Sequence, residues 1–168
     1  TDADGDSVTF TVSGSELAIT SAGVLTFASA PDYENKTSYT ATVTATDGTN
    51  STTQAITVNV TNVNEAPSFT SSSTFSAAEN QTAIGSVTAT DAEDDEITFT
   101  VSGSELAISS TGVLTFASAP DFETKSTYTA TVTVTDGTNS TTQAITVNVT
   151  NVVENSSPVF TSNSSYTV

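Results

Sequence analysis

The chain lacks several residue types on which common protein chemistries depend. Its 168 residues include no cysteine, histidine, methionine or tryptophan. Without cysteine there can be no disulfide, thiolate metal site or cysteine nucleophile. Without histidine, both the usual zinc ligand and the usual general base are missing, and a Ser-His-Asp triad is impossible. No run of apolar residues approaches the ~18 that a membrane helix needs.

Positive charge is almost absent as well. Two lysines face 19 acidic residues, which gives a net charge of −17. A chain without a cationic surface cannot neutralise phosphates, so nucleic acids and anionic membranes are excluded as partners. Acidic side chains that cluster in a fold repel one another unless a cation binds among them. Dispersed over a solvated surface, the same acids would need no partner.

Internal repetition dominates what is present. Residues 1–62 align without gaps with residues 90–151, and 51 of these 62 positions are identical. The 89-residue period is too long for a solenoid turn and suits a small β-sandwich of about 100 residues. We expect a partial module at 1–63 that lacks the first two strands, a complete module at 64–153, and the first strand of a further module at 154–168.

The two ends of the chain allow two interpretations. Residues 157–168 resemble residues 67–77, so the chain is most simply a window cut from a continuing array. Alternatively, the tail completes the first module of a neighbouring chain, although this would leave the second strand unsupplied.

Alternating character predicts an all-β fold. Threonine is abundant and favours strands, and in residues 127–135 apolar and threonine residues alternate with a period of two. Turn signals separate seven such segments, which predicts seven-stranded Greek-key β-sandwich modules. The expected strands are 68–75, 85–90, 97–102, 106–109, 113–118, 127–135 and 141–149. The expected core is Phe99, Leu106, Ile108, Leu114, Phe116, Tyr128, Val132, Ile145 and Val147.

The acidic residues fall between these strands, in loops that a sandwich gathers at its two ends. Carboxylate, amide and backbone carbonyl oxygens are the ligands that calcium selects. One end of the complete module should carry Asp91, Glu93 and Asp136. The other end should carry Glu79, Asp121 and Glu123 with the exit segment residues Asn151, Glu154 and Asn155.

Five short motifs carry a resemblance to a known family. They are Asp-Ala-Glu at 91–93, Pro-Asp-Phe-Glu at 120–123, Thr-Asp-Gly-Thr at 135–138, Ala-Glu-Asn at 78–80 and Asn-Val-Asn-Glu-Ala-Pro at 62–67. In their order along the chain they resemble the calcium motifs of cadherin repeats, and the chain is similar to the cadherin-like, Ig-like tandem domains of large bacterial surface and secreted proteins. The linker at 151–158 departs from the pattern, because it is two residues longer than the first linker and loses its second Asn.

The resemblance implies that calcium ions bind between successive modules. The joint between the two modules would use Asp32, Glu34, Asn62, Asn64 and Glu65 from the first and Asp91, Glu93 and Asp136 from the second. A preceding module would be faced by Asp2, Asp4 and Asp47. A following module would be faced by Glu79, Asp121, Glu123, Asn151, Glu154 and Asn155.

These patterns predict a non-enzymatic extender or adhesive repeat region of a long extracellular or cell-surface protein. Its partners would be calcium, neighbouring repeats and, for adhesion, a cell-surface glycan or a homophilic partner. A carbohydrate- or protein-binding module and a subunit of a self-assembling extracellular filament remain alternatives. An EF-hand is disfavoured, because the segment DADGDS has no Gly at position 6. A glycosidase carboxylate pair is disfavoured by the duplication of the loop and the absence of tryptophan.

Overall fold

A computed structural model describes residues 3–155, and every regular element in this range is a strand. The predicted all-β fold is therefore confirmed. The chain divides into two compact units, unit 1 at Thr1–Glu65 and unit 2 at Ala66–Val168. Within the described range, no helix is long and apolar enough to cross a membrane.

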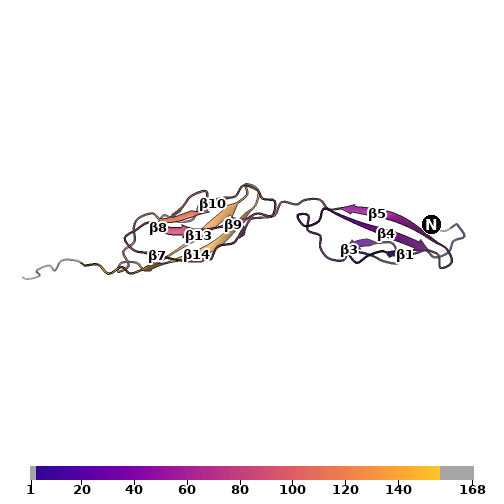
Figure 1. The fold of residues 1–168 in the computed structure, drawn as a ribbon, viewed down its shortest axis with the longest axis horizontal. Coiled ribbons are helices and arrows are strands. Elements are labelled where there is room, and N and C mark those ends of the chain that lie inside the picture. The colour runs from indigo at the N-terminus through magenta and orange to yellow at the C-terminus, as the bar shows by residue number, and fades with distance from the viewer. Residues whose placement is uncertain (1–2, 156–168) are drawn as a thin grey trace, which may run out of the picture. The chain divides into compact units, whose positions relative to one another are not determined.

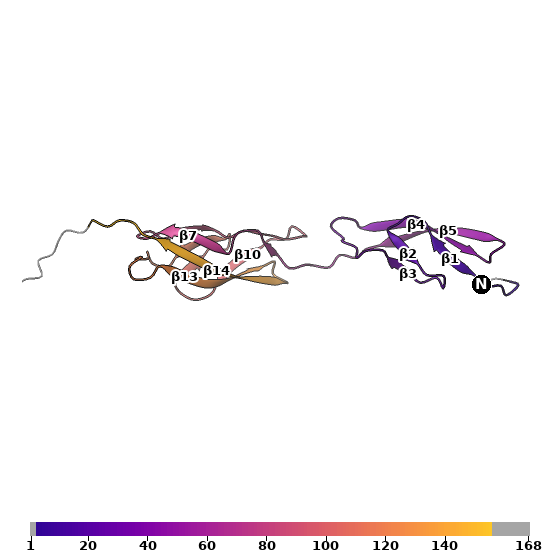
Figure 2. The ribbon, with the colours of Figure 1, turned by 90° about the horizontal axis from the view of Figure 1, so that it is seen from below.

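The described part of unit 2, residues 66–155, contains nine strands in three sheets. They are β6 (Ser68–Phe69), β7 (Thr74–Ala78), β8 (Ala83–Ser86), β9 (Ala89–Thr90), β10 (Thr98–Val101), β11 (Leu106–Ile108), β12 (Val113–Phe116), β13 (Thr127–Thr135) and β14 (Ser140–Thr150). One sheet has the order β10-β13-β14-β7, a second the order β11-β12-β8, and β6 pairs with β9. Only β7 runs parallel to its neighbour, β14, and Figure 2 shows these two strands side by side.

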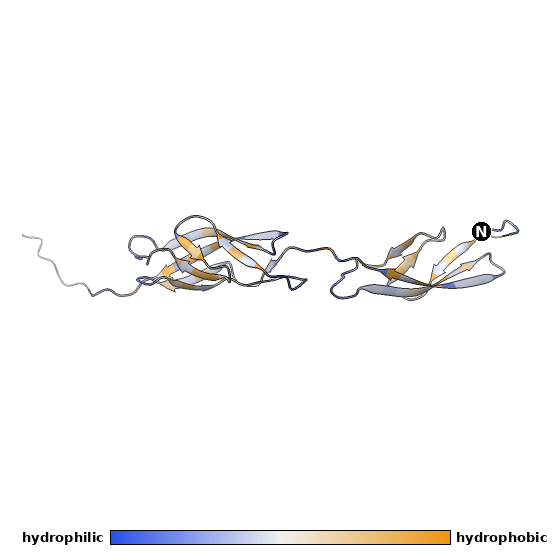
Figure 3. Cartoon of the chain, turned by 90° about the horizontal axis from the view of Figure 1, so that it is seen from above, coloured by the Kyte–Doolittle hydropathy of each residue, from blue (hydrophilic) through white to orange (hydrophobic). Residues whose placement is uncertain are grey.

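The core of unit 2 follows from the alternation of the strands. On β13, Val132 and Val134 are fully buried, whereas the threonines between and beside them lie on the other face of the strand. On β14, Ile145 and Val147, which lie opposite Ala130 and Tyr128 of β13, are buried in the same cluster. The labelled strands in Figure 1 carry these residues, and Figure 3 shows hydrophobic segments on the strands and hydrophilic residues in the loops.

The first two predicted strands of this unit differ from the structure. Each is divided into two short strands, β6 and β7 in place of 68–75 and β8 and β9 in place of 85–90. The reason is that the chain changes sheets: β6 pairs with β9, whereas β7 pairs with β14. Continuous alternation of apolar and polar residues does not reveal such a change of partner.

Most of the predicted core residues are buried. Seven of the nine are buried, and the other two, Ile108 and Tyr128, are half-buried and pack against the cluster. The ring of Tyr128 meets that of Phe116 edge-on, with centroids 5.1 Å apart. Four members of the buried hydrophobic cluster were not predicted: Ala77, Val87, Val134 and Val149.

Unit 1 repeats the second half of this architecture. Its strands are β1 (Thr9–Val12), β2 (Leu17–Ile19), β3 (Leu25–Phe27), β4 (Ser38–Thr46) and β5 (Ser51–Asn59). They form the sheets β1-β4-β5 and β2-β3. The registers are those of unit 2 shifted by 89 residues: Phe10 lies opposite Ala45 as Phe99 lies opposite Val134. Among the described hydrophobic residues of this unit, Leu17 alone is buried.

The same substitution should lower the free energy of unfolding of the two units by different amounts. Leu114 is 0% exposed, whereas the matching Leu25 is 37% exposed. We expect Leu114→Ala to lower the free energy of unfolding of unit 2 by about 2–5 kcal/mol, because it opens a cavity in a packed core. Leu25→Ala should cost unit 1 less than about 1 kcal/mol. Hydrogen exchange of peptides from β13 and β4, which differ in mass because Val134 replaces Ala45, reports the units separately by mass spectrometry. Equal losses in both units would contradict this account of the core.

Candidate metal site

Glu79 is a buried acid at the point where β7 ends. The parallel ladder between β7 and β14 extends one step past Ala78, because the Glu79 N–H donates to the Thr150 carbonyl at 3.2 Å. The residue is 2% exposed, which is unusual for a glutamate unless its charge is compensated. Its Oε2 accepts a hydrogen bond from the Phe122 N–H at 2.8 Å, and its Oε1 accepts one from the Val152 N–H at 2.7 Å. One carboxylate thus joins β7, the loop after β12 and the segment that leaves β14.

The loop after β12 presents two further acids in a turn of fixed shape. Asp121 Oδ1 accepts a hydrogen bond from the Thr124 N–H at 3.1 Å, and its Oδ2 accepts one from the Thr124 hydroxyl at 3.0 Å. The Asp121 carbonyl accepts the Lys125 N–H at 2.9 Å. Within this turn, Glu123 Oε1 accepts a hydrogen bond from the side-chain amide of Asn151. The turn therefore holds both acids beside the exit of β14.

Asn80 also forms a hydrogen bond to the segment that leaves β14. It adopts a left-handed backbone with φ of 63°, a conformation that Asn tolerates better than most residues. Its N–H donates to the Pro120 carbonyl at 3.0 Å, and its side-chain amide donates to Glu154 Oε1 at 2.6 Å. The sequence reasoning included Asn80 in a motif but not in the ligand set. The remaining predicted residue of this end, Asn155, is exposed.

Three carboxylates converge here. Glu79, Asp121 and Glu123 each offer an oxygen, and these oxygens all lie within 4.8 Å of one another. At such a separation, two unit charges repel by about 3 kcal/mol at an effective dielectric constant of about 20, and by less where water screens the exposed partners. No lysine offsets this, because Lys125, one of only two lysines in the chain, binds Glu105 at 2.5 Å and lies 4.5 Å from the centroid of the Tyr128 ring.

The donor set of this cluster suits a hard cation. It consists only of oxygen ligands, three carboxylates and the nearby amide of Asn151, and the chain has neither histidine nor cysteine to bind a softer metal. Calcium takes six to eight such oxygens in flexible geometry. The residues present therefore fit calcium, with Glu79 as the buried member of the set.

The opposite end of unit 2 is built from two separate turns. Asp91 Oδ1 accepts hydrogen bonds from the N–H groups of Glu93 and Asp95 at 3.1 and 3.3 Å. Its Oδ2 is buried and accepts no hydrogen bond from the described residues. Asp136 Oδ1 caps another turn, accepting the Thr138 and Asn139 N–H groups. The structure does not bring Asp91, Glu93 and Asp136 together as a group of three convergent carboxylates.

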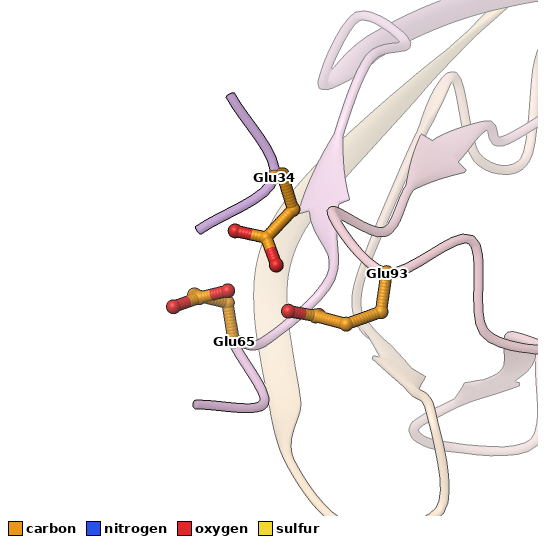
Figure 4. Close-up of side chains that lie close together, drawn as sticks. All are labelled: Glu34, Glu65 and Glu93. Carbon is orange, nitrogen blue, oxygen red and sulfur yellow. The ribbon is translucent and has the colours of Figure 1, made fainter. Parts of the chain in front are cut away.

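Five predicted ligands of unit 1 lie in the loop after β3 and in the segment after β5. The carboxylate oxygens of Glu34 and Glu65 lie within 4.8 Å of each other, and Figure 4 draws these two side chains. Asp32 Oδ1 accepts the Asn35 N–H at 3.0 Å, and the Asn64 side chain donates to the Glu65 carbonyl at 3.2 Å. Figure 4 also labels Glu93, which lies on the loop between β9 and β10.

Among the described residues, no other predicted acid of unit 1 joins this pair. Asn62 is exposed, Asp4 is exposed in the loop before β1, and Asp2 lies outside the described residues. Asp47 caps the turn after β4 as Asp136 caps the turn after β13. The backbone N–H of Asn50 and that of Thr49 donate to Asp47 and lower the pKa of its carboxyl below the ordinary 3.8.

We expect Glu79 to stabilise unit 2 through its two backbone contacts. Glu79→Ala leaves two part-buried N–H groups without an acceptor, each at a cost of up to about 1–3 kcal/mol. The free energy of unfolding of unit 2 should fall by about 2–5 kcal/mol in calcium-free buffer. The matched control is Glu105→Ala. It removes an exposed ion pair, which contributes about 0–1 kcal/mol to the free energy of unfolding. A loss no larger than that of the control would show that the carboxylate does not hold the three segments together.

Asp47 provides a prediction of pH dependence. Because its pKa is lowered in the folded chain, its contribution to stability is present above the unfolded pKa and is lost as the pH falls through the folded value. A carboxyl-detected NMR titration should give Asp47 a midpoint below 3.8 in the folded chain and the ordinary value, about 3.9, in urea. The same midpoint in both states would show that the turn contacts do not lower the pKa of Asp47.

Several proteins of known structure have a fold similar to that of this chain. Solved structures similar to the chain include Drosophila N-cadherin EC1-4, at 23% identity and a TM-score of 0.60, covering 90% of this chain and 43% of that one. Human protocadherin-24 EC1-2 matches at 20% identity and a TM-score of 0.63, covering 90% of this chain and 86% of that one. Mouse cadherin-23 EC22-24 matches at 23% identity and a TM-score of 0.55, covering 87% of this chain and 55% of that one.

At these identities the likeness concerns the fold, and it confirms the predicted cadherin-like sandwich. No curated protein sequence matches the chain. The family model of the bacterial Ig domain matches residues 64–150, which is more than half of the chain. The chain therefore belongs to the bacterial Ig domain family, in a form with the cadherin-like fold.

Proposed function

We propose that the chain is a repeat region of a long extracellular protein, in which bound calcium stiffens the segments that connect successive modules. The observation that carries the proposal is the convergence of Glu79, Asp121 and Glu123 at the point where the chain leaves β14. Such a region would serve as an extender or an adhesive stalk rather than as an enzyme.

The physical effect of an ion at this site follows from its contacts. Glu79 accepts the Val152 N–H, and Glu123 accepts the Asn151 side chain, so the acids of the cluster already touch the exit segment. A bound calcium ion would remove the repulsion among the three carboxylates and recruit further oxygens from that segment. The exit segment would then leave the module in a fixed direction, whereas without calcium it would be free to bend.

The remaining predicted ligands are proposed on the family resemblance. Asp91 adds one supporting observation, because a buried carboxylate oxygen without a hydrogen-bond donor is suited to a cation. The other members of this set are Asp2, Asp4, Asp32, Glu34, Asp47, Asn62, Asn64, Glu65, Glu93 and Asp136.

Calcium binding to the full chain tests the proposal. We expect calorimetric titration to show calcium binding, and hydrogen exchange of residues 151–155 to slow when calcium is added. The double variant Asp121→Asn/Glu123→Gln keeps the shape of the loop and removes two charges. Because affinity for calcium depends on the charge of the ligands, the dissociation constant for the site in unit 2 should rise at least about tenfold, equivalent to about 1.4 kcal/mol.

The matched control is Glu16→Gln/Glu105→Gln, which removes the same charge from two exposed acids that bind lysines. It should leave calcium binding almost unchanged. A magnesium titration separates a calcium site from simple attraction of divalent ions. Absence of calcium binding, or exchange of residues 151–155 that calcium does not change, would refute the proposal.

A further inference from the structure

An Asp-Gly pair occupies the same place in each of the two units. Asp136-Gly137 lies in the loop 136–139, between the paired strands β13 and β14, and Asp47-Gly48 lies in the loop 47–50, between β4 and β5. Glycine has no side chain to hinder its backbone nitrogen, so this nitrogen can attack the side chain of a preceding aspartate. Both pairs are therefore candidate sites for isomerisation of aspartate to isoaspartate.

Isomerisation proceeds through a cyclic succinimide. The glycine nitrogen forms a bond to the aspartate Cγ and loses its proton, and a side-chain oxygen leaves as water. Water then adds to the main-chain carbonyl carbon of the aspartate, and the bond between this carbon and the glycine nitrogen breaks. In the product, the main chain runs through the former side chain. The water released in the first step balances the water consumed in the second, so no other reactant is needed.

The nitrogen that would attack is held by a threonine hydroxyl in both turns. The Gly137 N–H donates to Thr135 Oγ1 at 3.0 Å, and the same hydroxyl donates to the Asn139 carbonyl at 2.7 Å. In unit 1, the Gly48 N–H donates to Thr46 Oγ1 at 3.0 Å. The threonine at the end of each long strand thus connects the glycine N–H to the far side of the loop.

The carboxyl group that would be attacked is held as well. Asp136 Oδ1 accepts the Thr138 N–H at 2.6 Å and also the Asn139 N–H. The Asp47 carboxylate accepts the two corresponding N–H groups of unit 1. These donors follow the glycine in the chain, so both reacting groups are bound to partners other than each other. Ring closure requires these hydrogen bonds to break.

We propose that Asp47 and Asp136 are isomerisation sites that their turns keep unreactive. Thr46 and Thr135 act as positioning residues, because each holds the N–H of the reacting glycine. Only the open turn reacts, so the rate follows the population of turns that have opened locally. Isoaspartate adds a carbon to the main chain of the loop and displaces the capping carboxylate, so the closed turn does not re-form after the reaction.

Ageing of the full chain at neutral pH in calcium-free buffer tests the proposal independently of calcium binding. Isoaspartate is measured by mass spectrometry with electron-based fragmentation, on peptides that differ between the units because Val134 replaces Ala45. Linear peptides of residues 132–141 and 43–52 give the rates without the folded turn. We expect both sites to react at least about tenfold more slowly in the folded chain, because most turns are closed.

Thr135→Val tests the role of the hydroxyl, because valine keeps the β-branched shape. Relative to a linear peptide with the same substitution, isomerisation at Asp136 should become about fivefold faster or more, since the glycine N–H is released. Asp47 in the same chain should keep its rate. The matched control, Thr133→Val, makes the same change on the same strand away from the turn and should leave both rates unchanged.

Thr135→Ser separates the hydroxyl contact from the stability of the strand. Serine keeps the hydroxyl but favours strands less than valine does, so we expect the slow rate to return. Faster reaction in Thr135→Ser than in Thr135→Val would assign the effect to strand stability and overturn the proposal. Equal rates in the folded chain and the linear peptides, or an unchanged rate at Asp136 in Thr135→Val, would overturn it as well.

Discussion

The burial of a charge at Glu79 is the constraint on which the end of unit 2 depends. A carboxylate that is 2% exposed is costly unless hydrogen bonds or an ion compensate it. The parallel pairing of β7 with β14 places Glu79 where the Phe122 and Val152 N–H groups can reach it. The same pairing determines which loops meet there. The strand order and the candidate metal site are thus consequences of one arrangement, and neither could change without the other.

The duplication separates the effect of sequence from the effect of neighbours. Most residues of unit 1 are identical to those of unit 2, yet Ile56 and Val58 are partly exposed whereas Ile145 and Val147 are fully buried. The registers of the paired strands are the same in both units. Local sequence therefore determines the strands and their register, and burial depends on β7 and β8, which pack from outside this segment.

The same distinction explains how far sequence alone could predict the structure. Alternation of period two predicted β13 and β14 and most of the core, because it reflects local backbone geometry. It missed the division of 68–75 into β6 and β7, because that division depends on which sheet each half joins. Ala77 and Val87 were missed for the same reason, since they lie on β7 and between β8 and β9, in the segments that cover the core from its edge.

Prediction from local sequence is limited in the same way at the candidate metal site. Loop topology predicted that Glu79, Asp121 and Glu123 gather at one end, as the structure shows. It did not predict that Asp136 is engaged in capping its own turn, because side-chain hydrogen bonds to nearby N–H groups compete with more distant partners. The backbone donors of Phe122 and Val152 carry no sequence signal at all, since every residue except proline has an N–H group.

The scarcity of lysine leaves few counter-charges for the acids within the chain. Each lysine is used locally in the same way, paired with a glutamate and lying against a tyrosine ring, as Lys36 is with Glu16 and Tyr39. Monovalent salt cannot take over the role of a counter-charge at the acidic cluster. At physiological ionic strength the screening length is about 8 Å, whereas the three carboxylates lie within 4.8 Å of one another. A cation that coordinates the oxygens directly acts at that range, and this supports the proposal of a bound divalent ion over a general dependence on salt.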